Sequence, residues 1–237
     1  MSLDIRELSV NIKNKRVIES INLTINLGEI HVVMGPNGVG KTTLIYSILN
    51  HPNYKKSGKI FLDNEDITNL ETYNIIRKGI GVVLQHNVNI DGLKLSRLLW
   101  ESSKEHYKSV NEYNNNLNRL MGKLSLKREF LERTLVGFSG GERKRIELLI
   151  CLMQKPRFLL IDEIDSGLDV DNIKMVAKII NEIKREKGIL LITHYTKLLH
   201  FLSVDKVYVL FNKRIVKVGG KELALEIESK GYENLLK

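Results

Sequence analysis

The chain has 237 residues, of which 43% are hydrophobic and 27% are charged. This composition supplies a large buried core and excludes a disordered or low-complexity chain. The formal net charge is +9, but the Lys and Arg residues are scattered, and no segment interleaves them with aromatic residues. A nucleic-acid partner is therefore disfavoured, and we expect a solvated basic surface.

The longest apolar runs, such as Phe158–Ile161 and Ile189–Ile192, are far shorter than a membrane span. The first residues lack both the layout of a secretory signal and the bias of a transit peptide. Together these features predict a cytoplasmic protein without direct membrane insertion. The single cysteine, Cys151, excludes an internal disulfide and a cysteine-based metal site held by this chain alone, and its apolar neighbours predict that it is buried.

Residues 3–10 and 17–27 alternate apolar and polar side chains, which is typical of half-buried antiparallel strands. A short buried strand follows at Ile30–Met34, and Thr42–Leu49 then continues as a helix. Between this strand and this helix lies the pattern G-x-x-x-x-G-K-T, at residues 35–42. A phosphate-binding loop requires this strand–loop–helix context.

The glycines of this loop let the backbone curl, so that its amides and the helix N-terminus point at phosphate oxygens. Lys41 is placed to reach the β- and γ-phosphates of ATP, and Thr42 offers a hydroxyl to Mg²⁺. The predicted ATP-binding residues of the loop are Gly35, Pro36, Asn37, Gly38, Val39, Gly40, Lys41, Thr42 and Thr43.

Strand patterns recur at Lys59–Leu62 and at Gly81–Leu84, and Gln85 follows the second strand. From Leu95 to about Met153 strand patterns vanish, and apolar residues repeat at helical spacing. We therefore expect an inserted helical lobe, with Asn-rich connections at Asn111–Asn118.

Two apolar runs, Phe158–Ile161 and Ile189–Thr193, flank a helix of about Asp171–Lys187, which predicts parallel strands covered on both faces. A hairpin and a charged helix follow, at residues 206–218 and about 220–230. We therefore predict a single α/β P-loop domain over residues 1–237, with a mixed sheet, helices on both of its faces and antiparallel N-terminal strands. Its core lobe would comprise residues 1–85 and 155–237, and its helical lobe residues 86–154 approximately.

A pair of carboxylates ends the strand at Phe158–Ile161. Asp162 can hold Mg²⁺ directly or through water, as the magnesium ligand beside the phosphate loop. Glu163 points differently and is placed to polarise an attacking water. The second carboxylate predicts an ATPase that hydrolyses its nucleotide.

The run Ser139, Gly140, Gly141, Glu142 resembles the signature of ABC-type ATPases. With Gln85, Ser166–Asp169 and His194, the resemblance covers essentially the whole chain in the family's order. It implies that two protomers sandwich two ATP molecules head to tail, each signature closing on the γ-phosphate that the other chain holds. In that arrangement Gln85 senses the γ-phosphate and the metal, and His194 orients the γ-phosphate. The residues that the resemblance adds to the ATP site are Ser139, Gly140, Gly141, Glu142 and Asp169.

Two positions depart from the pattern of transporter ATPases. Those proteins usually follow the catalytic Glu with Pro-Thr or Pro-Ser, whereas this chain has Ile164 and Asp165. They also usually carry an aromatic residue near the end of the first strand, where the adenine stacks. Here that neighbourhood is Val10–Lys13, which favours a loose selectivity for the base.

The runs Gly137–Arg145 and Asp162–Asp169 resemble one branch of the family most, the SufC ATPases of SUF iron–sulfur cluster assembly. The ending Glu228–Tyr232 also resembles that branch, whereas residues 86–136 are divergent. The resemblance implies SufB- and SufD-like scaffold proteins as partners. The single cysteine agrees, since the thiolates that hold a nascent cluster then come from the partners.

Two alternatives stay open: the cytoplasmic ATPase of a membrane transporter, which would purify with membrane components, and a nucleic-acid-linked ABC ATPase. The scattered charge and the single ATPase unit disfavour the second. The segment after Gln85 joins the predicted sensor of the γ-phosphate to the helical lobe, so a protein bound to it would respond to the γ-phosphate. In transporters the resembling groove takes a membrane-domain helix, and in the SUF branch it takes the scaffold proteins. Val88, Ile90 and Leu93 are the predicted docking residues, because a loop with Asn and Gly has little core in which to bury them.

Overall fold

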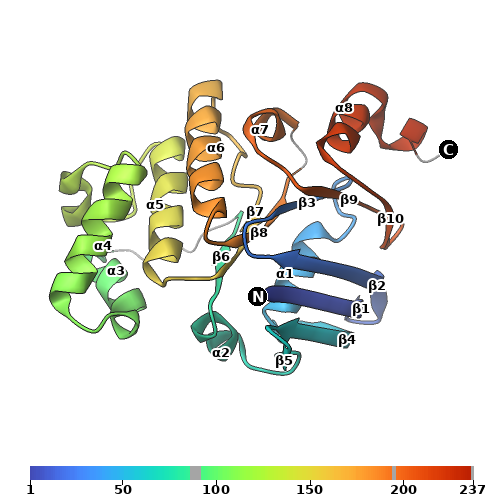
Figure 1. Cartoon of the computed structure of the whole chain (residues 1–237), viewed down its shortest axis with the longest axis horizontal. Helices are drawn as coiled ribbons and strands as arrows, with labels where there is room; N and C mark the ends of the chain where they lie inside the picture. The colour runs from blue at the N-terminus through green and yellow to red at the C-terminus, as the bar shows by residue number, and fades with distance from the viewer. Residues whose placement is uncertain (86–91, 194–195, 236–237) are drawn as a thin grey trace.

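The computed structural model describes residues 1–85, 92–193 and 196–235. Two sheets form its framework (Figure 1). The smaller sheet is antiparallel, in the order β2-β1-β4-β5, with bounds β1 Ser2–Ile12, β2 Lys15–Asn26, β4 Tyr54–Leu62 and β5 Glu65–Asp66. The larger sheet has the order β10-β9-β3-β8-β7-β6, with bounds β3 Ile30–Met34, β6 Ile80–Val83, β7 Phe158–Asp162, β8 Gly188–Ile192, β9 Lys206–Phe211 and β10 Arg214–Gly219.

Within the larger sheet the pairs β3–β8, β3–β9, β6–β7 and β7–β8 are parallel, and only β9 and β10 pair antiparallel. Because parallel strands end at the same edge, β3, β6 and β7 deliver their carboxyl-terminal residues to one place. The helices are α1 Lys41–Ile48, α2 Thr72–Arg77, α3 Leu95–Ser103, α4 Val110–Lys123, α5 Gly140–Met153, α6 Val170–Lys184, α7 Thr196–Phe201 and α8 Lys221–Leu235. Short 3₁₀ turns lie at Lys104–His106 and Arg128–Glu132.

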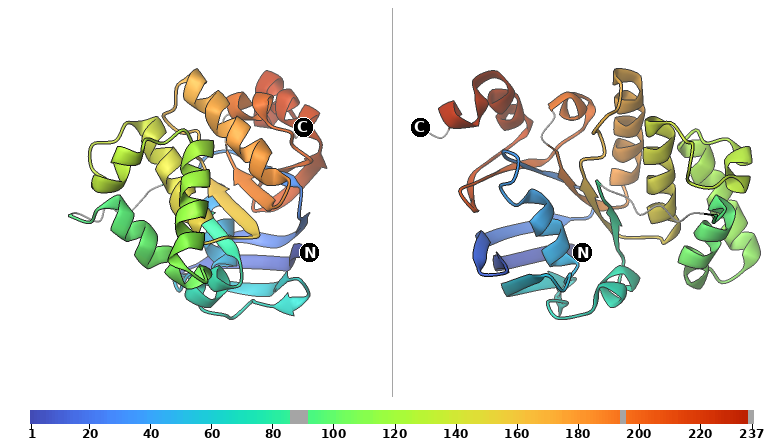
Figure 2. Two further views of the ribbon diagram at one scale, coloured as in Figure 1. Left: turned by 60° about the vertical axis from the view of Figure 1, so that its left-hand side comes forward. Right: turned by 180° about the vertical axis from the view of Figure 1, so that it is seen from behind.

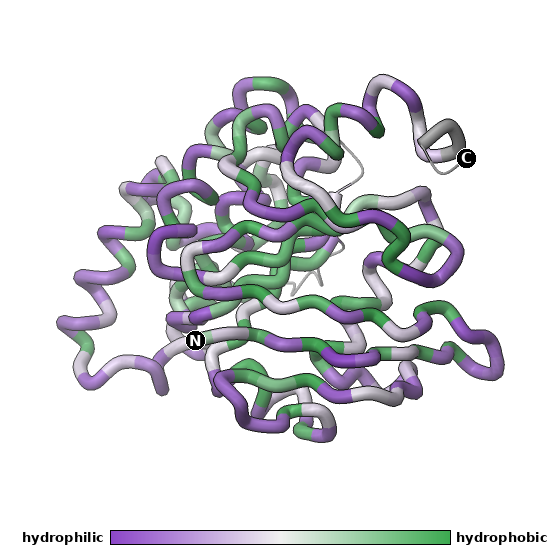
Figure 3. The backbone as a smooth tube through the Cα atoms, turned by 45° about the vertical axis from the view of Figure 1, so that its right-hand side comes forward, coloured by the Kyte–Doolittle hydropathy of each residue, from purple (hydrophilic) through white to green (hydrophobic). Residues whose placement is uncertain are grey.

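The central strands bury both of their faces, as their continuous apolar runs require. Alternate residues of β3 show this, since Val32 packs among the helices α5 to α8, whereas Val33 packs against α1 and the antiparallel sheet. The two views of Figure 2 show these layers, and Figure 3 shows the hydrophobic residues concentrated on the central strands. The mixed α/β P-loop architecture predicted from the sequence is confirmed.

Helices α3, α4 and α5 extend away from the antiparallel sheet (Figure 1). Their buried side chains, among them Leu99, Leu117 and Ile146, belong to the same apolar cluster as one face of the central sheet. This segment is therefore helical as expected, and it shares its core with the sheet. The predicted lobe boundary near residue 86 falls next to residues outside the described ranges, so it stays a prediction.

One sequence prediction is wrong: Asn111–Asn118 is not a connection but part of α4. Ser109 caps this helix by accepting a hydrogen bond from the backbone amide of Glu112 at 3.1 Å. Tyr113 and Leu117, at helical spacing, are buried against α5 and its neighbours. Tertiary burial of this apolar stripe outweighs the low helix propensity of asparagine. No helix in the described part of the chain is long and apolar enough to cross a membrane.

Candidate nucleotide-binding site

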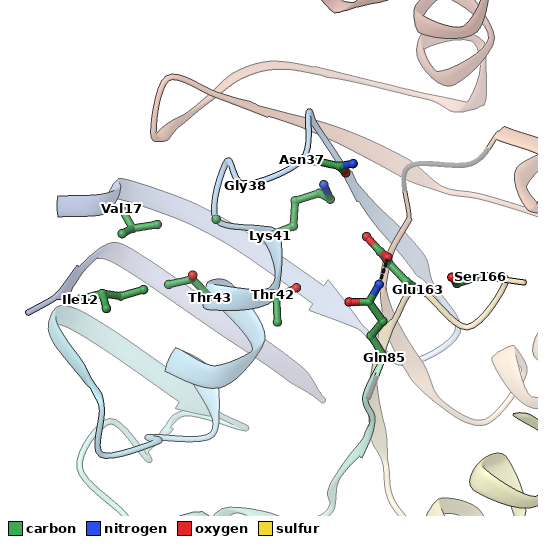
Figure 4. Close-up of a pocket in the computed structure, with 11 residues that line it drawn as sticks. Ile12, Val17, Asn37, Gly38, Lys41, Thr42, Thr43, Gln85, Glu163 and Ser166 are labelled. Atoms are coloured by element: carbon green, nitrogen blue, oxygen red, sulfur yellow. Dashed lines mark hydrogen bonds between the residues drawn. The ribbon is translucent and has the colours of Figure 1, made fainter. Parts of the chain in front are cut away.

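A cavity of about 570 Å³ opens where β3 ends and α1 begins (Figure 4). It lies where ligands bind in parallel sheets, beyond the carboxyl ends of the strands. Its walls come from the β1–β2 hairpin, the loop after β3, the start of α1, a residue shortly after β6 and the turn after β7. The described residues that line it are Ile12, Val17, Asn37, Gly38, Gly40, Lys41, Thr42, Thr43, Gln85, Glu163 and Ser166.

The loop after β3 has the backbone conformation that its glycines allow. Gly40 adopts φ 111°, in the left-handed region, and directly precedes α1. A Cβ atom added there would lie 2.9 Å from Cγ1 of Val17, so a side chain at residue 40 would also collide with the hairpin. These constraints fix the loop as a cradle whose amides continue into the N-terminus of α1, the anion-binding arrangement expected from the sequence.

Lys41 is buried at the floor of this loop, with 5% of its surface exposed. Its ammonium donates hydrogen bonds to the carbonyl oxygens of Gly35, at 2.8 Å, and Pro36, at 3.0 Å. Burial lowers the pKa of Lys41, and the nearby carboxylates of Glu163 and Asp162 oppose this shift. A triphosphate entering the loop would meet this ammonium already held in place and directed at the cavity.

The two predicted carboxylates differ in environment. Asp162 ends β7 and is fully buried, whereas Glu163 lines the cavity. Glu163 adopts φ 47°, an uncommon conformation for a residue with a side chain, and its amide donates to the carbonyl of Ile192 at 2.9 Å. This backbone turn separates the directions of the two side chains, as their different expected roles require.

Gln85 reaches the same carboxylate from the end of β6. Its side-chain amide donates a hydrogen bond to Oε2 of Glu163 at 2.5 Å (Figure 4). The structure therefore brings the predicted sensor and the predicted base into direct contact. This hydrogen bond occupies one acceptor site on Oε2, and the carboxylate keeps further acceptor sites with which it can polarise a water.

The residues expected to hold Mg²⁺ are Thr42, Gln85 and Asp162, whose hydroxyl, amide and carboxylate oxygens are the hard donors that this ion prefers. Thr42 and Gln85 line the cavity, and Asp162 lies directly before Glu163. Within the described ranges, no three His, Cys, Asp or Glu side chains gather as a metal cage. This donor set fits Mg²⁺ held jointly by the protein and by nucleotide phosphates.

The signature residues do not line this cavity. Ser139 instead caps α5: its hydroxyl accepts from the amide of Glu142 at 3.3 Å, and its own amide donates to the Glu142 carboxylate at 2.9 Å. Asp169 likewise caps α6 by accepting from the amide of Asn172 at 2.8 Å. Within one chain, the side chains of Glu142 and Asp169 thus serve helix caps, and their contact with ATP stays a prediction.

Sequence reasoning missed two contacts that organise this region. The side chain of Asn172 in α6 lies against Gly141 in α5, and a Cβ atom on residue 141 would collide with it. The first turns of α5 and α6 are therefore in close contact. The hydroxyl of Thr193 donates to Oδ2 of buried Asp165 at 2.9 Å. His194, the predicted switch residue, lies outside the described ranges, directly after Thr193.

A family model described as ABC transporter matches residues 18–166. The chain belongs to this family. A probable ABC transporter ATP-binding protein of Streptococcus pyogenes serotype M18 is 39% identical, over 98% of this chain and 94% of the relative. Vegetative protein 296 of Bacillus subtilis is also 39% identical, over 98% and 92%. The solved ATP-binding subunit of an ABC transporter has a TM-score of 0.84 at 23% identity and covers each chain completely, which supports the fold.

As an ABC ATPase, the chain binds ATP with Mg²⁺ and hydrolyses it. ABC ATPases dimerise. Dimerisation accounts for the observation that the signature residues do not line the cavity of their own chain. Hydrolysis breaks the bond between the γ-phosphorus and the bridging oxygen, and water supplies the new oxygen. The chain's own contribution is therefore positioning and electrostatic stabilisation, without a covalent intermediate.

Proposed function

We propose that this ABC ATPase is the energy-supplying subunit of a cytoplasmic SUF-type iron–sulfur cluster assembly complex. It dimerises head to tail on ATP and drives a change of shape in SufB- and SufD-like scaffold proteins. Lys41 and the loop amides hold the triphosphate, and Ser139 with the N-terminus of α5 closes on it from the partner chain. Glu163 polarises the attacking water, and His194 orients the γ-phosphate.

Gln85 transmits the presence of nucleotide. Its hydrogen bond with Glu163 competes with binding to the γ-phosphate and the metal, so nucleotide binding draws this side chain away from the carboxylate. A scaffold protein bound to the segment after Gln85 would therefore respond to the binding of ATP.

The observation that carries the SUF assignment is the turn after Glu163. Where transporter ATPases usually have Pro-Thr or Pro-Ser, this chain has Ile164 and Asp165, and both are buried. Asp165 holds the hydroxyl of Thr193, the residue before the predicted switch. The two residues that differ from the transporter pattern are thus part of the buried core. This agrees with the resemblance of Asp162–Asp169 to SufC ATPases. Buried Cys151 is the chain's single cysteine, so cluster thiolates must come from a partner.

The rival function is the ATPase of a membrane transporter, and the names of relatives favour it. The Streptococcus pyogenes relative is called a probable ABC transporter ATP-binding protein, and a Synechocystis relative, 35% identical over 98% of this chain and 95% of the relative, is called a probable ATP-dependent transporter. The two functions differ in the partner, so the partner decides between them.

The test is to purify the tagged chain from its native cells in mild detergent and to identify the proteins that accompany it. We expect soluble scaffold proteins that carry cysteine thiolates, and reconstituted scaffold should gain iron–sulfur absorbance faster with wild-type chain and ATP than with Glu163→Gln. Co-purification of membrane-spanning subunits instead would overturn the SUF assignment in favour of the transporter.

A second experiment addresses the docking segment. Val88 and Ile90 lie outside the described residues, and their role stays a prediction from the sequence. Replacing both with Asp should abolish scaffold capture while MgATP binding is retained. The matched control replaces Val216 and Val218 of β10, which are 44% and 54% exposed, with Asp. Native scaffold affinity in the Val88 and Ile90 variant would exclude this segment as the coupling surface.

A further inference from the structure

The last helix of the chain, α8, lies close to the start of the phosphate loop. It packs against α7, β9 and β10 (Figure 1). Its buried residues Leu223, Ala224 and Ile227 belong to the same apolar cluster as one face of the central sheet. Strand β9 also borders the loop, since a Cβ atom on Gly35 would collide with the carbonyl oxygen of Leu210. A side chain near the end of α8 can therefore reach the loop.

The backbone of α8 breaks at Gly231. This residue has φ 74° and ψ 164°, a conformation that essentially only glycine adopts. In an unbroken helix, position 231 would continue the buried stripe, and position 232 would lie about 130° away from its centre. The break instead turns Tyr232 inward, where it packs against the apolar cluster. The glycine thus determines where this tyrosine lies.

The hydroxyl of Tyr232 lies at Gly35, the first residue of the phosphate loop. Its oxygen is shielded from solvent. Burial raises the pKa of Tyr232, and the backbone of Gly35 opposes this shift. A backbone group lowers the pKa of a phenol by donating toward its oxygen, so the group that faces the hydroxyl is the Gly35 amide. Among the described residues no group reaches full hydrogen-bond geometry with this oxygen, so the contact is a loose one.

Gly35 also holds the lysine of the phosphate loop. Its carbonyl oxygen accepts a hydrogen bond from Nζ of Lys41 at 2.8 Å. Tyr232 faces the amide of this glycine and Lys41 its carbonyl, so the two side chains contact neighbouring peptide groups. A displacement of Gly35 would move the carbonyl oxygen that fixes the Lys41 ammonium. The position of Tyr232 is therefore coupled to that of Lys41 through a single residue.

Polar contacts with α7 fix α8 on both sides of its buried stripe. Nζ of Lys221 donates to the carbonyl oxygens of His200, at 2.8 Å, and Leu202, at 3.2 Å. One turn before Tyr232, Oε2 of Glu228 lies 3.1 Å from Nε2 of His200. The segment that carries Tyr232 is therefore held by α7 as well as by the core.

We propose that Tyr232 is a positioning residue of the ATPase site, which holds Gly35 in place and thereby directs the Lys41 ammonium at the triphosphate. Lys41 acts on the bound phosphates, whereas Glu163 polarises the water from the turn after β7. Loss of the tyrosine hydroxyl should therefore weaken the binding of MgATP and MgADP and leave the hydrolytic step nearly unchanged. This role concerns the ATPase reaction itself and is independent of the partner protein.

The first test is Tyr232→Phe in the full chain, which removes the hydroxyl and keeps the ring. Kd for MgADP, measured by calorimetry, and KM for MgATP should both rise about three- to tenfold, with kcat within about twofold of wild type. The matched control, Tyr73→Phe, changes a tyrosine of α2 that is 55% exposed and should alter none of these constants. Urea unfolding of both variants is measured alongside. Native nucleotide affinity in Tyr232→Phe, with or without a loss of stability, would overturn the proposal.

The second test moves the tyrosine instead of truncating it. Gly231→Ala should raise Kd for MgADP as Tyr232→Phe does, because alanine cannot adopt the backbone angles of residue 231 without strain. The double variant should bind like either single variant, since a displaced hydroxyl has no contact left to lose. Gly122→Ala is the control: a Cβ atom there meets no atom within 4 Å, and residue 122 lies in α4, so affinity should stay native. Native affinity in Gly231→Ala, or additive losses in the double variant, would contradict a route through Tyr232.

Discussion

At the scale of single residues, the site depends on a few side chains held in uncommon positions. Glu163 adopts a left-handed backbone conformation, which costs about 1 kcal/mol or more for a residue with a side chain. The fold maintains it through the hydrogen bond to Ile192 and the buried turn that follows. This conformation directs the carboxylate into the cavity, while its neighbour Asp162 stays buried.

Replacing Glu163 with Gln should lower kcat by about 100-fold or more, because an amide of the same shape cannot polarise water. Binding of MgATP should be retained, and size-exclusion chromatography in MgATP should show a trapped dimer. Glu182→Gln on the exposed face of α6 is the control and should keep wild-type turnover. Wild-type kcat in Glu163→Gln would mean that the base lies elsewhere.

Cys151 gives a second prediction at this scale. Burial raises the pKa of its thiol from 9.0 to about 12, so the folded chain keeps the proton where the unfolded chain releases it. The free energy of unfolding should therefore fall as the pH rises from 9 towards 12, and this contribution should vanish in Cys151→Ala. At about pH 8.5 the native thiol should resist iodoacetamide and become reactive in urea. Rapid alkylation of the native protein would contradict its burial.

The residues that the sequence revealed are those within short motifs: the phosphate loop, Asp162, Glu163 and the glutamine after β6. Local spacing alone places them on a strand, loop or helix. The pairs Asp165–Thr193 and Gly141–Asn172 could not be predicted in this way. Their members come from different elements, and they meet only when the sheet and the helices assemble.

At the scale of elements, the strands and long helices follow from apolar periodicity, but two short helices were missed. Helices α2 and α7 have 6 residues each. Helix α2 buries only Ile75, so it has no repeating stripe for a sequence pattern to show. Strand β4 also begins earlier than expected, at Tyr54, because its polar residues pair with β1. Backbone pairing with β1, which hydropathy does not reveal, determines where β4 begins, whereas its end at Leu62 is the predicted one.

Helix α5 carries a nearly buried ion pair. Nζ of Lys144 lies 3.3 Å from Oε2 of Glu147, and their side chains are 11% and 9% exposed. The same ammonium donates a hydrogen bond to the backbone carbonyl oxygen of Gln85 at 3.4 Å. It therefore links α5, the helix that begins at the signature, to the predicted sensor residue. Burial raises the pKa of Glu147, and the cations of Lys144 and Arg143 oppose the shift.

Lys144→Met should therefore destabilise the chain by about 2 kcal/mol, because it leaves the buried Glu147 carboxylate with the more distant Arg143. The double variant Lys144→Met, Glu147→Leu should recover most of this loss, since no buried charge then remains. Urea unfolding measures both. Lys127→Met, from a surface pair with 74% and 68% exposed side chains, should change stability by less than about 0.5 kcal/mol. A loss that the double variant does not recover would contradict this account.

At the scale of the whole molecule, one chain contains all the motifs but does not bring them together. Ser139 and Gly140 begin α5, Asp169 caps α6, and none of them lines the cavity that holds Lys41 and Glu163. The sequence alone could not show this separation, because motif order gives no distances. In the head-to-tail dimer that we propose, the signature of the other chain would close each cavity, and the complete site would belong to two chains.

This composite site predicts complementation between two inactive variants. Ser139→Arg should still bind MgATP but should block closure, because a bulky cation replaces the cap of α5. Lys41→Ala should bind MgATP poorly, because the triphosphate loses its buried cation.

In a mixed dimer one cavity combines an intact Lys41 with an intact Ser139 of the other chain. An equimolar mixture should then recover up to about a quarter of wild-type activity, since half of the dimers are mixed and one of their two sites is intact. ATPase assays of each variant and of the mixture measure this, with Ser139→Thr as the conservative control. A mixture as inactive as its components would argue against sites shared between chains.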